Sequence, residues 1–244
     1  GSPYSQSSKD GLTWSFESDR ESAMTSKKPQ KPQTTLGMTR ISAGPDGHEA
    51  RYLDDSIPTD KEDRELHFAG RFVEKYNSDY VPTPEAAILS FTQNDTSDLD
   101  FDLECGVADY LELAAIKPLS ERFGQEIANT GKIDILQLGE WIYESLIVGK
   151  QSKYGDLSRR VILLLYPEDW QFILSDSVLW CLAGLCRTRG TTFAGVFTIG
   201  GPPGLDLVAM ISPNHGDVPD PESFAGKHYW NLPPGKHEHK IDLK

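Results

Sequence analysis

Cysteine and histidine are the side chains of this sequence that carry the chemistry of a covalent hydrolase. Cys105 stands where the sequence predicts the start of a helix, and a helix N-terminus favours the nucleophilic thiolate over the thiol. Two histidines follow far downstream, His215 and His228, and Asn231 comes shortly after the second. Thiol catalysis needs a cysteine, a base and a group that orients the base. The chain therefore contains the residue types that this chemistry requires.

The order of these residues resembles that of papain-like cysteine hydrolases and deubiquitinating proteases. In those enzymes a cysteine at a helix start precedes a sheet, and a histidine with an Asn or Asp partner follows. The residues around Cys105 do not carry the local signature of that family, and the charge of Glu104 opposes formation of the thiolate. We therefore expect Cys105 to be a small structural residue. A hydrolase that uses Cys105 with His215 or His228 is the alternative function.

The other two cysteines are expected to pack in the core. Cys181 and Cys186 lie on one predicted helix but project from different faces of it, whereas zinc-binding cysteine pairs usually sit on a loop or knuckle. The sequence therefore predicts no metal site and no cofactor. Three cysteines do not make a disulfide framework, and so low a count suits a reducing compartment.

The glycine- and proline-rich segment 200–204 superficially resembles a phosphate-binding loop. Pro202 and Pro203 each remove a backbone N–H donor, and no helix follows to supply a positive terminus. We expect instead a hairpin turn, and its rigid tip at Pro202 and Pro203 is a candidate contact surface for a partner.

Residues 1–58 are rich in Ser, Thr, Pro, Gln and Lys, and their few apolar side chains follow no sustained period. Such a segment does not bury enough apolar surface to offset the entropy of ordering, so we expect a disordered leader. Trp14 and Phe16 lie among acidic and serine residues and form a candidate docking motif. Ser18, with Glu21 after it, resembles the substrate of an acidophilic kinase.

The chain has 244 residues and a formal net charge of -13. A surface this negative repels phosphate backbones, so we expect protein partners, particularly ones with basic surfaces, and not nucleic acid. No apolar run is long enough to cross a membrane, which takes about 20 residues, so we expect no membrane partner. An intracellular location, cytoplasmic or nuclear, fits these features.

Residues 59–230 are expected to form one domain, followed by a tail at 231–244. A capping box formed by Thr59 and Glu62 predicts the start of the first helix. Leu66, Ala69 and Phe72 then recur at helical spacing. After this helix we expect a strand at 86–91, an acidic loop at 92–102, helices at 104–115, 118–128 and 132–148, and a polar loop at 149–158.

The strongest core signal lies in the second half of the chain. Residues 161–166 are apolar without alternation, which predicts a strand covered on both faces. A helix at 175–187 is apolar on every side, and two further strands follow at 191–199 and 205–211. A strand, a helix and a strand so close together predict a right-handed crossover with parallel strands, followed by an antiparallel hairpin.

These elements predict an α+β fold in which a small mixed sheet contains a C-terminal β-α-β-β unit and carries helices on both faces. We expect the apolar helix on one face and the earlier helices on the other. The favoured function is a non-enzymatic protein-interaction module, such as an adaptor, a regulatory subunit or an assembly subunit, with a flexible acidic tail.

Overall fold

The computed structural model describes residues 36–44, 47–55, 57–81, 83–168, 174–200, 207–214 and 216–230. Several residues singled out in the sequence lie outside these ranges: Trp14, Phe16, Ser18, Pro202, Pro203, His215 and Asn231. Within the range predicted as a leader, β1 (Leu36–Gly44) and β2 (Gly47–Asp55) pair as an antiparallel hairpin. The sequence analysis did not predict this hairpin.

A mixed sheet of 6 strands forms the centre of the domain, in the order β3-β4-β5-β7-β8-β9. The inner strands β5, β7 and β8 are parallel, and the pairs β3–β4, β4–β5 and β8–β9 are antiparallel. The prediction of a mixed sheet with a parallel crossover and a terminal hairpin is therefore confirmed. The strands span Ile88–Gln93 (β3), Phe101–Cys105 (β4), Tyr110–Ile116 (β5), Val161–Pro167 (β7), Gly195–Gly200 (β8) and Leu207–Ser212 (β9).

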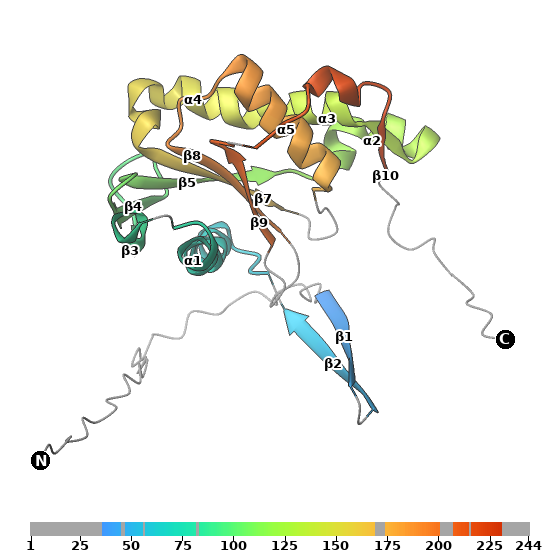
Figure 1. The fold of residues 1–244 in the computed structure, drawn as a ribbon, viewed down its shortest axis with the longest axis horizontal. Helices are drawn as coiled ribbons and strands as arrows, with labels where there is room; N and C mark the ends of the chain where they lie inside the picture. The colour runs from blue at the N-terminus through green and yellow to red at the C-terminus, as the bar shows by residue number, and fades with distance from the viewer. Residues whose placement is uncertain are drawn as a thin grey trace, which may run out of the picture. The chain divides into compact units, whose positions relative to one another are not determined.

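Helices cover both faces of this sheet (Figure 1). One helix, α1 (Lys61–Asp79), lies on one face, and the remaining long helices lie on the other. These are α2 (Leu119–Thr130), α3 (Ile135–Ile142), the π-helix η2 (Tyr143–Val148), α4 (Gly149–Tyr154) and α5 (Asp176–Arg189). Short 3-10 helices span Pro84–Ala86 (η1), Gly155–Arg160 (η3) and Pro221–Phe224 (η4).

Strand β7 separates two hydrophobic cores. Ile162 and Leu164 pack on the α1 side, whereas Leu163 and Leu165 pack among α3 and α5. Because successive side chains of a strand point to opposite faces, a strand covered on both sides is expected to be apolar at successive positions. Every residue of β7 is buried, as the sequence predicted.

The start of α1 differs by one residue from the prediction. Asp60, not Thr59, caps the helix, because its carboxylate accepts hydrogen bonds from the backbone N–H of Glu62 at 2.9 Å and of Asp63 at 3.3 Å. The capped helix then buries Phe72 against the sheet, together with Phe68, Ala69 and Tyr76.

The helix predicted at 104–115 is wrong. This stretch contains the end of β4 and nearly all of β5, and β5 lies between β4 and β7 in the sheet. Leu111 and Leu113 pack on the α1 side, and Ala114 packs on the other. Leu, Glu and Ala are good helix formers, but burial between two strands outweighs that preference.

Two further predictions about the helices need correction. The helix predicted at 132–148 begins with a short strand, β6 (Lys132–Asp134), and then runs through α3 and η2 into α4, so the polar loop expected at 149–158 is helical. Helices α3 and α5 also share one face instead of lying on opposite faces, since Leu138 and Cys181 belong to the same core.

The domain continues after β9 with two further elements among the described residues. Helix η4 packs against α5, and β10 (His228–Trp230) pairs antiparallel with β6. Among the helices that the structure describes, none combines the length and apolar character of a membrane span.

Candidate functional site

The structure does not bring the predicted catalytic residues together. Cys105 ends strand β4 and packs at the margin of the α1-side core, where its thiol donates a hydrogen bond of 3.4 Å to the carbonyl of Ala86. It therefore has no helix N-terminus beside it. His228 lies in β10, whose neighbour Tyr229 packs against the other core.

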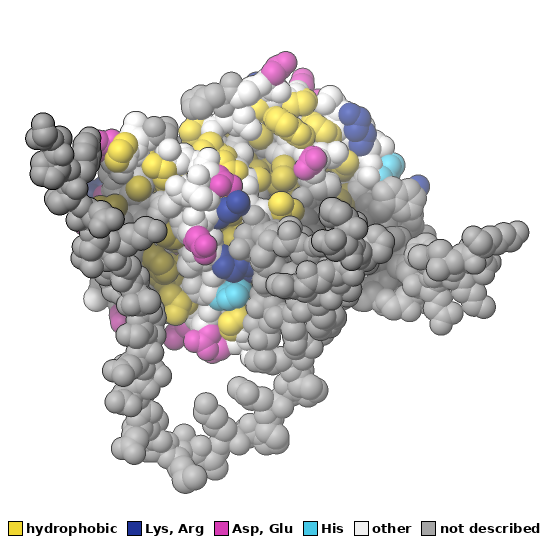
Figure 2. Space-filling view, turned by 60° about the horizontal axis from the view of Figure 1, so that its bottom comes forward, with side chains coloured by type: hydrophobic (Ala, Val, Ile, Leu, Met, Phe, Trp, Pro, Cys, Tyr) yellow, Lys and Arg dark blue, Asp and Glu magenta, His cyan; other side chains and the backbone are white. Residues whose placement is uncertain are grey.

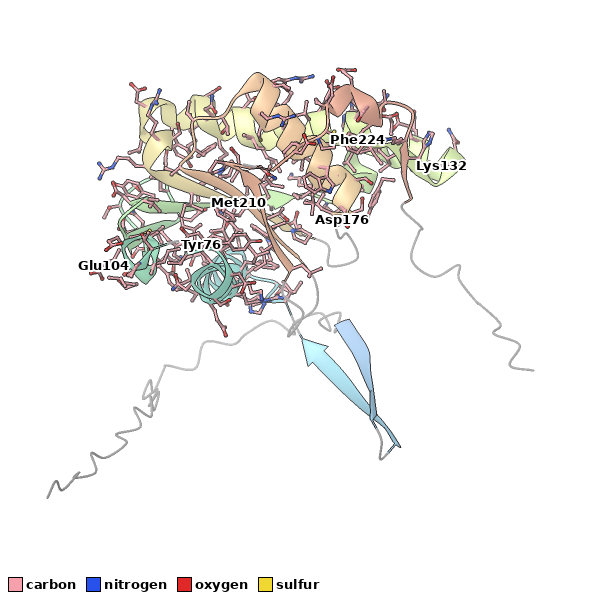
Figure 3. All side chains as sticks on the ribbon, in the orientation of Figure 1. Tyr76, Glu104, Lys132, Asp176, Met210 and Phe224 are labelled. Carbon is pink, nitrogen blue, oxygen red and sulfur yellow. The ribbon has the colours of Figure 1, made fainter. Side chains whose placement is uncertain are left out.

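The positions of two labelled residues show this separation (Figure 3). Glu104 adjoins Cys105, whereas Lys132 lies in β6 opposite Trp230 of β10. The two labels lie at opposite ends of the domain. Cys105 and His228 therefore form no catalytic pair in this structure. His215 and Asn231 lie outside the described residues, so a role for His215 stays a prediction.

Cys181 and Cys186 pack in the core as predicted, both on α5. Burial raises the pKa of each thiol to about 12. A thiol with so high a pKa is neutral at physiological pH and neither attacks nor binds metal readily. Among the described residues, no group of three or more His, Cys, Asp and Glu side chains is arranged to hold a metal ion.

An apolar groove runs between the first turns of α5 and the edge strand β9. Two adjoining hollows, of about 170 and 300 Å³, share Asp176, Leu179 and Ala209 and so form one continuous groove. Trp180 lines one hollow and Leu207 the other. We call this surface the α5–β9 groove.

The position of the α5–β9 groove follows from the topology of the sheet. The groove lies at the carboxyl ends of the parallel strands β7 and β8, where Pro167 and Gly200 line it. In open α/β sheets ligands bind at this end of the strands, because the connecting loops gather there. Gly200 and Leu207 also flank segment 201–206, so the predicted contact loop at Pro202 and Pro203 begins and ends at the groove.

Large apolar side chains are exposed in this groove. Trp180 is 41% exposed and Leu207 is 60% exposed, although both belong to elements that pack in the domain. Figure 2 shows hydrophobic side chains at several places on one face of the molecule, interspersed with charged ones. Exposed apolar surface of this kind marks contact sites.

The backbone of β9 is not open to a further strand at this point. The hydroxyl of Tyr80 donates a hydrogen bond of 2.6 Å to the carbonyl of Val208 on the outer side of β9. Burial raises the pKa of the Tyr80 phenol, and a hydrogen bond from the backbone of Met210 acts in the opposite direction. The carbonyl of Val208 is therefore not free to pair with a further strand.

No family model, no curated protein and no solved structure matches this chain. The functional argument therefore rests on the geometry of the molecule.

A second, larger cleft lies at the other end of α5. It has a volume of about 730 Å³ and lies between α2 and the α3–η2 segment, with Arg189 of α5 at its border. Phe123 and Trp141 meet edge to face in it, with ring centroids 5.7 Å apart. We call this surface the helix cleft. Sequence reasoning did not find it, because it depends on how α2 packs against α3 and on Arg189, which lies 49 residues after Glu140.

A third feature of the domain is a set of buried carboxylates on β5 and α1. Glu112 of β5 is 1% exposed and pairs with Lys150 of α4. Burial, followed by the charge of Asp100, raises the pKa of Glu112, and the same two causes raise the pKa of Glu65 on α1. Neither the α5–β9 groove nor the helix cleft is lined by Glu112, and its side chain is buried, so we assign these groups to the interior.

Proposed function

We propose that this protein is a non-enzymatic interaction module that binds a partner protein in the α5–β9 groove. The observation that carries the proposal is the exposed indole of Trp180 in an apolar groove whose other walls include Leu179 and Met210. Tryptophan is enriched among the residues that contribute most of the binding energy of protein interfaces. Such residues usually lie in pockets from which water is excluded.

The groove favours an amphipathic helix as the bound segment. Because the Tyr80 hydroxyl occupies the carbonyl of Val208, strand addition is disfavoured there, and in this proposal binding depends on side chains that enter the groove. Asp176 lies at the rim, and the chain carries a net charge of -13. Basic residues flanking the apolar face of the partner would complement this charge and speed association.

The same reasoning supports an intracellular setting. All three cysteines are free thiols in the structure, which suits a reducing compartment. Pro202 and Pro203, which lie outside the described residues, supply a second contact in this proposal.

Photocrosslinking from within the groove tests the proposal. A photoreactive phenylalanine derivative replaces Trp180 or Leu207 in the full chain, and Leu89, which is 71% exposed on the edge strand β3, is the matched control position. We expect both groove positions to capture the same partner and the Leu89 position not to capture it. Capture of only a second copy of this chain would replace the proposal with self-association.

Affinity measurements on the purified partner complete the test. Trp180→Ala should weaken binding at least tenfold, since loss of a central aromatic anchor typically costs about 2 kcal/mol or more. Leu89→Ala should leave the affinity unchanged. Equal affinity of the wild type and Trp180→Ala for that partner would overturn the proposal.

A further inference from the structure

The two helices that form the helix cleft are both irregular at the cleft. In α2 the backbone leaves helical geometry at Phe123, with φ of -113° and ψ of 19°. On the facing side, α3 widens into the π-helix η2, and the N–H of Gly149 bonds to the carbonyl of Glu144 instead of to the residue four positions back. Such wide turns are rare, because their hydrogen bonds are poorer, and they occur frequently at functional sites.

The irregular segments are also the ones that line the cleft. Phe123 of α2 contributes an aromatic side chain to the lining, and η2 contributes the polar side chains of Glu144 and Ser145. The hydroxyl of Ser145 donates a hydrogen bond to the carbonyl of Trp141, so it satisfies a backbone acceptor within the irregular segment. The backbone of α2 and of η2 is thus irregular at the positions that line the cleft.

The helix cleft already holds one guanidinium. Arg189 reaches from the last turn of α5 and forks between two carboxylates, pairing with Glu140 and, at 3.3 Å, with Glu144. The hydrogen bond with Glu140 raises the pKa of Arg189 above its usual value. The two glutamates therefore already bind a guanidinium. Their side chains are 39% and 57% exposed, so a competing group can reach them.

The remaining groups favour a cation over an anion. Glu126 adds a third carboxylate to the lining, against the two guanidinium groups of Arg122 and Arg189. Arg122 lies over the ring of Phe123, 5.3 Å from its centroid, and Arg189 is engaged by the glutamates. An aromatic ring beside carboxylates is the usual environment for a bound Lys or Arg side chain. The net charge of -13 further opposes an anionic ligand.

We propose that the helix cleft binds an arginine-bearing segment of a partner protein, whose guanidinium displaces Arg189 from Glu140 and Glu144 and packs beside Trp141. This site is distinct from the α5–β9 groove. Asp176 and Arg189 lie at opposite ends of α5, about 20 Å apart at 1.5 Å per residue. The proposal therefore stands or falls independently of the proposed function of the groove.

Nuclear magnetic resonance of the indole N–H groups in the full chain tests this proposal. The probe is the peptide acetyl-Gly-Arg-Gly-Arg-Gly-amide at physiological salt, and the same peptide with Glu in place of Arg is the charge control. We expect the Trp141 resonance to shift saturably with the arginine peptide and not with the glutamate peptide. The Trp180 resonance, in the other groove, should not move.

Substitutions then separate a receptor from a general acidic surface. Glu140→Gln and Glu144→Gln should each weaken binding at least threefold, whereas Glu62→Gln, an exposed carboxylate on α1, should not. Arg189→Ala should strengthen binding, because it removes the internal competitor. Weaker binding by Arg189→Ala, equal shifts of Trp141 and Trp180, or binding of the glutamate peptide would each overturn the proposal.

Discussion

The hydroxyl of Tyr80, directly after α1, donates a hydrogen bond of 2.6 Å to the backbone carbonyl of Val208 in the edge strand β9. Edge strands expose unpaired N–H and C=O groups that invite pairing with another chain. In β9 the Tyr80 hydroxyl occupies one such group, the carbonyl of Val208. The sheet is thereby protected at the strand that borders the α5–β9 groove.

The same helix end reaches the opposite edge of the sheet. The side-chain amide of Asn77 accepts a hydrogen bond from the N–H of Ile88 at 2.9 Å and donates one to its carbonyl at 2.8 Å. Ile88 begins β3, the other outer strand. The last turn of α1 therefore ties the backbone of both outer strands to the helix, which positions β9 for the groove.

We predict that Tyr80→Phe destabilises the domain and increases its self-association. The variant keeps the ring but leaves the carbonyl of Val208 without its donor, which typically costs about 1 kcal/mol. Urea unfolding measures the loss, and sedimentation velocity measures self-association. Ser78→Ala, whose hydroxyl bonds only within the same helix end, is the control and should change the free energy of unfolding by less than about 0.5 kcal/mol. Identical stability and association state of Tyr80→Phe and the wild type would contradict the prediction.

Glu112 should make the domain less stable as the pH rises. Burial and then the charge of Asp100 raise the pKa of Glu112 above its ordinary value of 4.5, although Lys150 acts in the opposite direction. The folded state therefore holds this proton more tightly than the unfolded state. Its contribution to stability is full below pH 4.5 and is lost as the pH rises through the higher pKa of the folded state.

Unfolding of Glu112→Gln by urea between pH 4.5 and 8 checks this effect. The variant has no proton to lose, so its free energy of unfolding should fall less steeply with pH, by at most about 1.4 kcal/mol per pH unit. Glu74→Gln, at an exposed position of α1, should keep the slope of the wild type. Parallel pH profiles of Glu112→Gln and the wild type would refute the assignment.

The cysteines should differ in their reactivity with iodoacetamide. Burial raises the pKa of both Cys181 and Cys186 to about 12, whereas Cys105 is only partly buried. At pH 8 we expect the native protein to take up one label, on Cys105, and the unfolded protein to take up three. Mass spectrometry of the intact chain and its peptides measures both numbers. Labelling of Cys181 or Cys186 in the native state would contradict the core assignment.

The rate of that labelling also tests the alternative function. A catalytic thiol reacts far faster than an ordinary one at neutral pH, because an adjacent base lowers its pKa. The Cys105 thiol donates its hydrogen bond to a backbone carbonyl, that of Ala86, and a carbonyl is not a general base. We therefore expect a rate no higher than that of a free cysteine peptide. A much faster reaction that is lost in His215→Ala would revive the hydrolase hypothesis.

Sequence patterns predicted the elements whose burial leaves a periodic signal. Strand β7 has no polar residue between Val161 and Pro167 because both of its faces are covered. Helix α1 buries one face only: Ala69 and Phe72 of the predicted face are buried, whereas Leu66 is 47% exposed. The crossover from β7 through α5 to β8 then followed from chain length and handedness. These elements fix the centre of the sheet.

The errors arose where tertiary position outweighs local preference. Residues 110–116 have the composition of a helix, but they lie as β5 between two strands, where Glu112 finds Lys150 from α4. Cys105 lost its predicted helix for the same reason, because it belongs to the preceding strand. No local pattern distinguishes these strands from helices, since their pairing partners are distant in the chain.

The candidate sites were harder to predict than the fold. The helix cleft joins Glu140 to Arg189, which are 49 residues apart, and its π-turn has no known sequence signature. The sequence analysis did not predict the α5–β9 groove, and its contact site at Pro202 and Pro203 lies outside the described residues and stays a prediction. Trp180, by contrast, was expected to be buried with the rest of its helix, but it lies on the side of α5 that lines the groove and is 41% exposed.

The close approach of α3 and α5 leads to a final prediction about Gly139 and Cys181. A methyl group at Gly139 would lie 2.8 Å from the Cys181 sulfur and 3.4 Å from a methyl carbon of Leu185. Both helices are fixed in the core, so Gly139→Ala should destabilise the domain by about 1–3 kcal/mol, despite the higher helix propensity of Ala.

A double-mutant cycle shows whether the clash with Cys181 is the cause. Cys181→Ala alone should lower the free energy of unfolding, because it leaves a small void among buried side chains. In Gly139→Ala/Cys181→Ala the new methyl group occupies the space of the missing sulfur, so the double variant should be more stable than the sum of the single effects by about 1 kcal/mol or more. Urea unfolding of the four proteins measures this coupling. Additive effects within about 0.5 kcal/mol would show that the two helices do not meet at these residues.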